Sequence, residues 1–431
     1  MTALVIGAAV SGRAAAHLLH ADGEKVVVYD RDPAAVAGIE ADEAHAGAWD
    51  RRYLDGVDLV VVSPGIPEHA APIVDAIASG LPLWSELELG YRHLTVPVVG
   101  VTATNGKTTI TELAAEMLTA SGVRALAVGN IGDPLSGAVD MAVDVLVVEA
   151  SSFQLRFVET FHARAAVLLN VAPDHLDWHG TFDAYLAAKQ RILERQEAGD
   201  VVVFDGDDPG AVAAVAGAVG RRVPVSGARR PEGGWGRERD CLVVGGAVIP
   251  LEGLVRSDDV MVVDLAAAAA AAMHVGATPE GVTQVATSYH PGHHRREVVG
   301  TWGGVTWVND SKATNPHAAV AAIRSYESVV VIAGGRNKGL DVTVIPREPN
   351  VRHVVAIGEA AAELAAFERV TVVDDLDEAV ELADRIAVPG DTVLLAPGCA
   401  SFDMFRSYAD RGARFSASVL KIKGDVTWPV S

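Results

Sequence analysis

The sequence predicts an α/β protein of three domains. Its 431 residues are too many for one hydrophobic core. Short apolar runs alternate with helix-like segments, and the loops after these runs are rich in small and polar residues, as in parallel sheets that bind ligands at their carboxyl edge. We expect a Rossmann-like N-terminal domain at residues 1–96, a central parallel-sheet domain at 97–289 and a Rossmann-like C-terminal domain at 290–431.

The first block opens like a dinucleotide-binding fold. An apolar strand at residues 3–6 is followed by Gly7, a helix, and a second strand that ends in an acidic residue. Ala9 replaces the middle glycine of the usual motif, which argues against NAD. Ser11 and Arg31 are candidates for holding a nucleotide diphosphate, and the alternative is that Gly7 serves only a tight turn.

A second ligand turn follows a strand predicted at residues 57–62. The turn contains Ser63, Pro64 and Gly65 and lies at the carboxyl end of that strand. Residues 86–97 lack a strand pattern, so we expect them to link to the next block.

The central block begins with a phosphate-binding loop between an apolar strand at residues 98–101 and a helix-like run at 110–118. Small residues let backbone N–H groups approach phosphate, Lys107 would neutralise its charge and the Thr108 hydroxyl would bind Mg²⁺. This predicts a domain of the P-loop ATPase type, the alternative being an ordinary strand-to-helix turn. The loop comprises Ala103, Thr104, Asn105, Gly106, Lys107, Thr108 and Thr109, with Ala103 in the place of the first glycine.

Polar side chains also follow the next strands of this block. Glu149 ends a strand predicted at 143–148 and is a candidate Mg²⁺ ligand, or else a carboxylate that interacts with a helix dipole. His175 lies in a polar run after a strand at 165–169, as a metal ligand or an orienting group. Asn130 lies in a turn that offers an amide side chain.

Lys189 is predicted to point inward. A helix at residues 182–194 would place Tyr185, Lys189 and Ile192 on one face. A buried lysine is costly unless it is paired or modified. Residues 229–239 are expected to form a surface loop, and the alanine run at 266–272 a helix.

The third block contains three more polar loops after predicted strands. The histidine run at 290–297 matches no standard zinc spacing, so a phosphate or substrate role for His294 and Arg295 is favoured. The loops at 310–316, 334–339 and 397–405 should gather at one edge of a parallel sheet.

Composition narrows the possible partners and the compartment. The net charge of −21, from 35 basic and 56 acidic residues, argues against nucleic acid and anionic membranes as partners. Two distant cysteines fit a reducing cytosol, and no apolar segment is long enough to span a membrane or to act as a secretory signal. We expect a cytoplasmic monomer.

Seven motifs together resemble the Mur ligase family of ATP-dependent peptidoglycan enzymes, and the resemblance spans nearly the whole chain. They lie at residues 102–109, 149–155, 170–179, 187–189, 294–297, 310–315 and 399–405. The first block, the Ser63 turn and the 399–405 loop are similar to the branch that adds D-glutamate to UDP-N-acetylmuramoyl-L-alanine.

The resemblance implies ATP, Mg²⁺ and a CO₂-derived carbamate on Lys189, with Lys107, His175 and Lys189 as catalytic residues. Mg²⁺ would be held by Thr108, Glu149, His175 and the modified Lys189, and ATP by the phosphate loop with Asp264, Arg295, Asp310 and Lys312. UDP would contact Ser11, Arg31, Ser63, Pro64 and Gly65, and the muramoyl-alanine end Asn130, Ser151 and His175. D-Glutamate would contact Thr314, Lys338, Ser401, Ser407 and Tyr408.

Some positions depart from the family pattern. Asp264 stands where an adenine-contacting Asn is expected, and Ser407 and Tyr408 where Asn and an aromatic residue are expected. The resemblance also implies that the third domain closes on the second, with a hinge near residues 288–292. Other readings are another amino-acid ligase of this family, a folate-polyglutamylating relative, a nucleotide-binding module without catalysis, or an NAD oxidoreductase.

Overall fold

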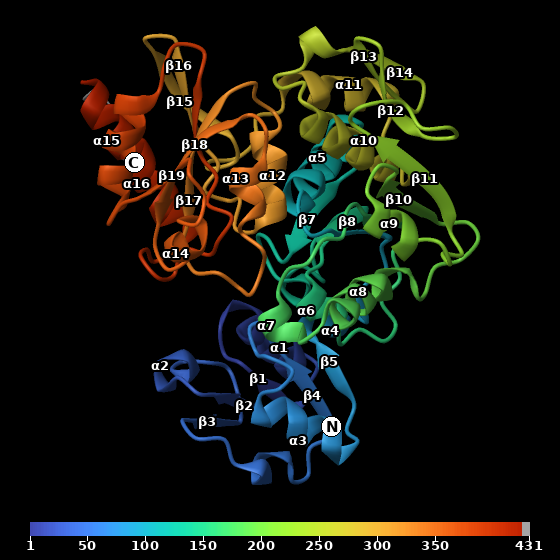
Figure 1. Ribbon diagram of the computed structural model, residues 1–431. Coiled ribbons are helices and arrows are strands. Elements are labelled where there is room, and N and C mark those ends of the chain that lie inside the picture. The colour runs from blue at the N-terminus through green and yellow to red at the C-terminus, as the bar shows by residue number, and fades with distance from the viewer. Residues whose placement is uncertain (425–431) are drawn as a thin grey trace. The chain divides into compact units, whose positions relative to one another are not determined.

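The computed structural model describes residues 1–424, which form three separate sheets (Figure 1). The chain divides into two compact units, one from Met1 to Tyr289 and one from His290 onward. The first unit contains two of the sheets and the second unit contains the third. The predicted α/β class with parallel-rich sheets is therefore confirmed.

The first sheet is a parallel five-stranded sheet of order β3-β2-β1-β4-β5. Alternate residues of β1 enter two hydrophobic clusters, one on each face, as a strand of period two requires. Its strands are β1 (Thr2–Ile6), β2 (Lys25–Asp30), β3 (Glu43–Ala46), β4 (Leu59–Val62) and β5 (Leu83–Ser85). Its helical segments are α1 (Val10–Ala21), α2 (Pro33–Val36), η1 (Arg51–Leu54), α3 (Ala71–Ser79) and α4 (Glu86–Tyr91).

Residues 86–97, predicted to lack a strand and to link to the next block, begin with helix α4. Ser85 accepts a hydrogen bond from the Glu88 N–H and so caps a helix whose first five residues are buried. The buried Glu88 carboxylate accepts hydrogen bonds from the backbone N–H groups of Glu159, Thr160 and Phe161. These bonds join the first block to the central one within a single compact unit.

The central sheet has nine strands in the order β14-β13-β12-β11-β10-β9-β6-β8-β7. The strands from β12 to β7 are parallel to their neighbours, and β13 and β14 form an antiparallel extension. The strands are β6 (Val98–Thr102), β7 (Ala125–Gly129), β8 (Val145–Glu149), β9 (Ala165–Leu168), β10 (Val201–Asp205), β11 (Arg221–Ser226), β12 (Trp235–Glu238), β13 (Cys241–Val244) and β14 (Ala247–Pro250).

The prediction of a surface loop at residues 229–239 is wrong in its second half, because Trp235–Glu238 forms β12. The predicted alanine helix is confirmed as α10 (Asp259–His274), which packs against α5 (Lys107–Ala120) on one face of the sheet (Figure 1). The remaining segments are η2 (Leu135–Gly137), α6 (Ser152–Leu155), α7 (Leu176–His179), α8 (Phe182–Gln190), η3 (Arg191–Leu193), α9 (Pro209–Ala214), η4 (Leu251–Gly253) and α11 (Pro279–Ser288).

The third sheet has the order β15-β16-β20-β17-β18-β19, in which only β15 is antiparallel to its neighbour. Polar loops follow β16, β17 and β20, which are parallel, so these loops lie at one edge as predicted. The strands are β15 (Glu297–Trp302), β16 (Val305–Asn309), β17 (Val329–Gly334), β18 (Val351–Ile357), β19 (Val370–Val372) and β20 (Thr392–Leu395). The helices are α12 (Pro316–Ile323), α13 (Val344–Arg347), α14 (Ala361–Leu364), α15 (Leu376–Ile386) and α16 (Tyr408–Lys423).

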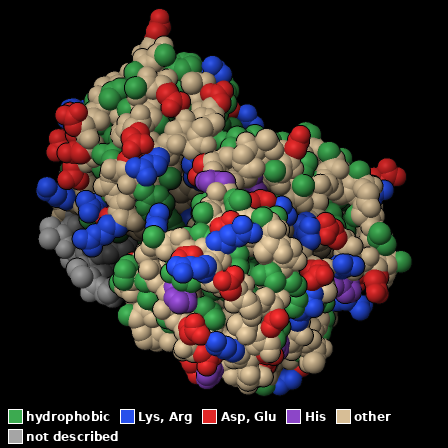
Figure 2. Space-filling view, turned by 90° about the horizontal axis from the view of Figure 1, so that it is seen from below, with side chains coloured by type: hydrophobic (Ala, Val, Ile, Leu, Met, Phe, Trp, Pro, Cys, Tyr) green, Lys and Arg blue, Asp and Glu red, His purple; other side chains and the backbone are tan. Residues whose placement is uncertain are grey.

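Two surface properties complete the description. Within residues 1–424, no helix combines the length and the apolar character that crossing a membrane requires. Acidic and basic side chains are interspersed over much of the face shown in Figure 2, and a group of acidic side chains gathers at its left edge.

Candidate active site

The phosphate loop joins β6 to α5, and α5 begins at Lys107 as soon as the loop ends. Gly106 precedes the helix with φ of 91°, in the left-handed region that favours glycine. A Cβ atom at Gly106 would lie 2.8 Å from the Asp264 Oδ1 atom of α10. The helix N-terminus presents backbone N–H groups and a positive dipole end, which suit an anion.

Asn170, which follows β9, fixes the shape of the loop. Its Oδ1 atom accepts a hydrogen bond from the Asn105 N–H at 2.9 Å, and its Nδ2 atom donates to the Asn105 carbonyl at 3.0 Å. The Thr104 hydroxyl lies 2.9 Å from the Tyr185 hydroxyl of α8. The loop is thus held from two neighbouring elements.

Two lysine amines meet at the carbonyl oxygen of Ala103. Lys107 Nζ donates to this oxygen at 2.8 Å, and Lys189 Nζ donates to it at 2.7 Å. Lys189 Nζ also lies 3.3 Å from the Thr102 hydroxyl. The side chains predicted to neutralise phosphate and to be modified therefore lie together on the loop.

Lys189 is 1% exposed, and the prediction that Tyr185, Lys189 and Ile192 share a buried face is confirmed. Burial lowers the pKa of Lys189 well below its usual value, and the charge of Lys107 lowers it further. Asp174 and Glu149 act in the opposite direction and are weaker. The two larger influences, burial and Lys107, both disfavour the charged form of Lys189.

Glu149 ends β8 at the same carboxyl edge and is 2% exposed. Its Oε1 atom accepts a hydrogen bond from Asn130 Nδ2 at 2.7 Å, whereas its buried Oε2 atom has no hydrogen-bond partner among the described residues. A buried carboxylate oxygen without a donor suits a cation. No group of three His, Cys, Asp or Glu side chains within residues 1–424 is arranged to hold a metal. Since Mg²⁺ usually takes one or two protein carboxylates together with phosphate oxygens and water, Glu149 still fits it.

His175 lies after β9 in a left-handed conformation, with φ of 52°. Asp174 accepts a hydrogen bond from the His175 N–H at 2.8 Å, and its Oδ2 atom lies 3.7 Å from His175 Nε2. The ring stands edge-on to Phe153. The Ser151 hydroxyl, a predicted substrate contact, takes part in the capping box of α6 with Gln154.

The predicted UDP residues lie at the carboxyl edge of the first sheet. Ser63 is buried and donates to the Gly7 carbonyl at 3.0 Å, whereas Arg31 is exposed and Ser11 half-buried. Pro64 is half-buried and Gly65 exposed. The turn that contains these residues is tied to the central block, because Trp178 Nε1 donates to the Ile66 carbonyl at 3.2 Å.

The second unit holds its predicted residues around the start of α16. Lys312 Nζ lies 3.9 Å from the centre of the Tyr408 ring, and Ser407 caps the helix. Asp310 accepts a hydrogen bond from the Arg296 N–H at 3.2 Å, and Arg295 is half-buried beside it. Of the remaining predicted residues, Ser401 is buried and Thr314 and Lys338 are half-buried.

Sequence reasoning missed Arg411, a guanidinium that is 1% exposed in this second group. It donates to the Ser311 hydroxyl and carbonyl and to the Cys399 carbonyl. Burial lowers its pKa to about 10. The only sequence signal is helical spacing, since Tyr408, Arg411 and Phe415 recur at three and four positions.

These features define a nucleotide-binding enzyme of three α/β domains, with a phosphate loop and two buried or half-buried lysines at the carboxyl edge of its central sheet. The chain matches three family models: the Mur ligase MurD-like N-terminal domain at residues 1–85, the Mur ligase middle domain at 101–227 and the Mur ligase glutamate ligase domain at 294–399. This protein belongs to the Mur ligase family.

Similar proteins cover almost the whole chain. A Frankia casuarinae protein named UDP-N-acetylmuramoylalanine–D-glutamate ligase is 42% identical over 98% of this chain and 94% of its own length. One of the same name from Pelotomaculum thermopropionicum is 39% identical over 97% of each chain. The solved structure of a pseudomurein peptide ligase type C from Methanothermus fervidus has a TM-score of 0.60 at 17% identity, covering 98% of this chain and 99% of its own. This last likeness shows the fold alone.

Proposed function

We propose that this protein is an ATP-dependent, ADP-forming ligase that joins D-glutamate to UDP-N-acetylmuramoyl-L-alanine during peptidoglycan precursor synthesis. The observation that carries the proposal is the meeting of Lys107 and Lys189 on the phosphate loop, with the Glu149 carboxylate at the same sheet edge. The choice of substrates rests on the curated relatives, which bear the name of that activity and match both ends of the chain.

The proposed reaction has two steps. The alanine carboxylate attacks the γ-phosphorus of ATP, ADP leaves, and an acyl phosphate forms. The amine of D-glutamate then attacks the acyl carbon, the amide bond forms, phosphate leaves, and a base takes the amine proton. Lys107 and the N-terminus of α5 stabilise the negative charge on the transferred phosphoryl group.

Thr108, Glu149, His175 and Lys189 are proposed to hold Mg²⁺, which supplies further charge neutralisation at the phosphate oxygens. Asn130 orients Glu149 by its hydrogen bond to Oε1, so that Oε2 is left for the cation. The low pKa of Lys189 supports a carbamate, because only the neutral amine adds to CO₂, and the product is an anion with loss of one proton.

We propose that UDP, ATP and D-glutamate bind at the residues predicted for them from the sequence. Ser11, Arg31 and the turn from Ser63 to Gly65 would hold UDP near the N-terminus of α1, where an anion is favoured. Asp264 and the phosphate loop, with Arg295, Asp310 and Lys312, would hold ATP. In the second unit Thr314, Lys338, Ser401, Ser407 and Tyr408 would contact D-glutamate. We propose that the enzyme acts in the cytoplasm as a monomer.

The test is release of phosphate from ATP by the purified protein with UDP-N-acetylmuramoyl-L-alanine and, in separate reactions, D-glutamate, L-glutamate, L-alanine or a diamino acid. Release only with D-glutamate supports the proposal. Release with a different amino acid would support the ligase reaction but contradict D-glutamate as the substrate. No release despite ATP binding would contradict the proposed activity.

A further inference from the structure

A second cavity lies in the first unit, at the amino ends of the central strands. It has a volume of about 510 Å³, and we call it the amino-edge pocket. It is lined by Tyr91 at the end of α4, by residues 94–98 of the chain into β6, by His162 and Arg164 before β9, and by His274 and Val275 at the end of α10. Because β6 and β9 are parallel, their phosphate-loop ends lie at the opposite edge, about 16 Å away for a five-residue strand.

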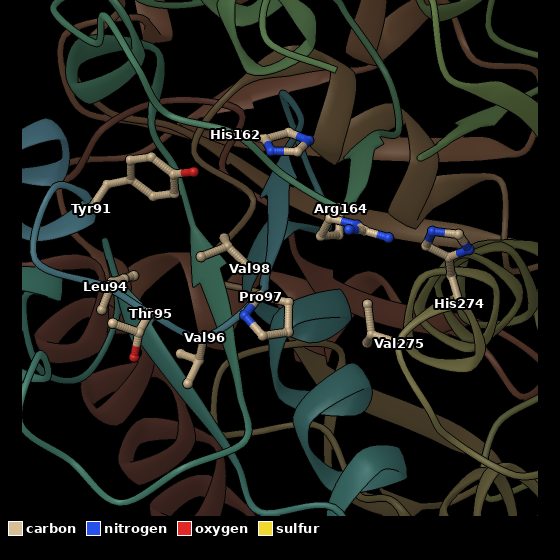
Figure 3. Close-up of a pocket in the computed structure, with 10 residues that line it drawn as sticks. All are labelled: Tyr91, Leu94, Thr95, Val96, Pro97, Val98, His162, Arg164, His274 and Val275. Atoms are coloured by element: carbon tan, nitrogen blue, oxygen red, sulfur yellow. The ribbon is translucent and has the colours of Figure 1, made fainter. Parts of the chain in front are cut away.

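Three cationic or titratable side chains meet at this pocket. Figure 3 shows the Arg164 guanidinium directed toward the His274 ring, with His162 on the same segment as Arg164. Burial lowers the pKa of His274, and the positive charges of Arg164 and Arg221 lower it further. The Asp200 carboxylate acts on His274 in the opposite direction and is the weakest of these influences.

The Asp200 carboxylate pairs with both His162 and Arg164. This carboxylate is 2% exposed and lies 2.6 Å from His162 Nε2 and 3.1 Å from Arg164 Nε. It also accepts a hydrogen bond from the Glu197 N–H at 2.7 Å. The Arg164 side chain is 52% exposed, so its guanidinium is open to solvent beside the pocket.

The rest of the lining is mostly apolar. Val96, Pro97 and Val275 face the space beside the guanidinium (Figure 3). A volume of this size suits a small organic molecule, and a guanidinium fork matches the two oxygens of a carboxylate or phosphate.

We propose that the amino-edge pocket binds a small organic anion, whose carboxylate or phosphate group pairs with Arg164 and whose apolar ring packs against Val96, Pro97 and Val275. This site is separate from the catalytic edge, and the proposal does not depend on the reaction proposed above.

The test is calorimetric titration of the full chain with 1-naphthoate, 1-naphthyl phosphate and the uncharged 1-naphthalenemethanol, with Mg-ADP present to occupy the phosphate loop. At least one anion should bind, and the alcohol should bind at least about tenfold more weakly, since hydrogen bonds to a charged group are lost. The better of the two anions identifies the head group.

Two variants locate the site. Arg164→Gln removes the positive charge from the pocket. Val275→Glu adds a negative charge that repels the bound anion. Each variant should therefore bind the anion at least about tenfold more weakly. Arg124→Gln is the matched control, because Arg124 precedes β7 at the same sheet edge but is fully engaged with Asp144 outside the pocket. The Arg124→Gln variant should bind the anion as tightly as the wild type does. Thermal unfolding should show that all three variants are folded. The proposal would be overturned if neither anion binds, or if the anion binds the Arg164→Gln and Val275→Glu variants as tightly as the wild type.

Discussion

The Nζ atom of Lys189 lies 2.7 Å from the carbonyl oxygen of Ala103, the residue that replaces the first glycine of the phosphate loop. Lys107 Nζ reaches the same oxygen at 2.8 Å. Burial and the nearby charge of Lys107 lower the pKa of Lys189 well below its usual value. The neutral amine is the form that a carbamate requires.

Lys189→Ala should lower ligase activity about 100-fold or more, because the carbamate anion proposed on Lys189 is lost from the phosphate loop. Short carboxylates such as acetate should restore part of the rate by entering the space left by the side chain. Phosphate release measures both effects. Lys25→Ala is the control, since Lys25 is an exposed partner of Glu43 far from the loop. Full activity in Lys189→Ala would remove this lysine from the mechanism.

Glu149→Gln should lower the ligation rate about 100-fold or more and raise the Mg²⁺ concentration needed for half-maximal activity. Thermal stability should not fall, because the substitution removes a buried charge whose Oε2 atom has no donor. Glu116→Gln on the exposed face of α5 should leave both unchanged. An unaltered Mg²⁺ requirement in Glu149→Gln would show that this carboxylate does not hold the metal.

The variants Gly106→Ala and Gly122→Ala separate the cost of backbone strain from the cost of steric crowding. Both glycines have positive φ, 91° and 83°, so each alanine costs about 1–2 kcal/mol of backbone strain. Only Gly106 is crowded, with Asp264 Oδ1 2.8 Å from the added Cβ, while the site at Gly122 is open. Chemical denaturation should show a larger loss for Gly106→Ala, and nucleotide affinity should fall in that variant alone. Equal losses with normal nucleotide binding would contradict the close packing of α10 on the loop.

His179 should make the protein sensitive to acid. Burial lowers its pKa to about 4 from an ordinary value of 6.5. The unfolded chain therefore binds more protons between these values, so stability is complete above pH 6.5 and declines as the pH falls toward 4.

His179→Gln, which keeps a hydrogen-bonding group near the Ser152 hydroxyl, should flatten this decline in urea unfolding measured across that range. A substitution of the exposed His69 should follow the wild type. Parallel curves for His179→Gln and the wild type would show that this histidine titrates normally.

Much of the fold is predictable from the sequence, because buried strands such as β1, β8 and β17 are continuous apolar runs. Strand β3 could not be predicted, since its residues, Glu43 to Ala46, are mostly exposed and not apolar. Strand β12 was hidden by its arginine and its glycine. Both strands exist because a neighbouring strand supplies their hydrogen bonds.

The candidate site, like the fold, could be predicted from the sequence only in part. Lys107, Glu149 and Lys189 could be named because each follows a strand or occupies a regular helical face. The pairing of Thr104 with Tyr185 joins residues 81 positions apart, and that of Arg411 with Ser311 joins residues 100 apart. Contacts over such separations leave no local pattern, so they become visible only in the folded chain.

The measurement that tests the central claim most directly uses UDP-N-acetylmuramoyl-L-alanine labelled with ¹⁸O in its carboxylate, incubated with ATP, Mg²⁺ and D-glutamate. Mass spectrometry then follows the label. Attack of the carboxylate on the γ-phosphate predicts one ¹⁸O atom in each phosphate released, together with the D-glutamyl product. Unlabelled phosphate, or a labelled phosphate formed with a different amino acid in place of D-glutamate, would contradict the account.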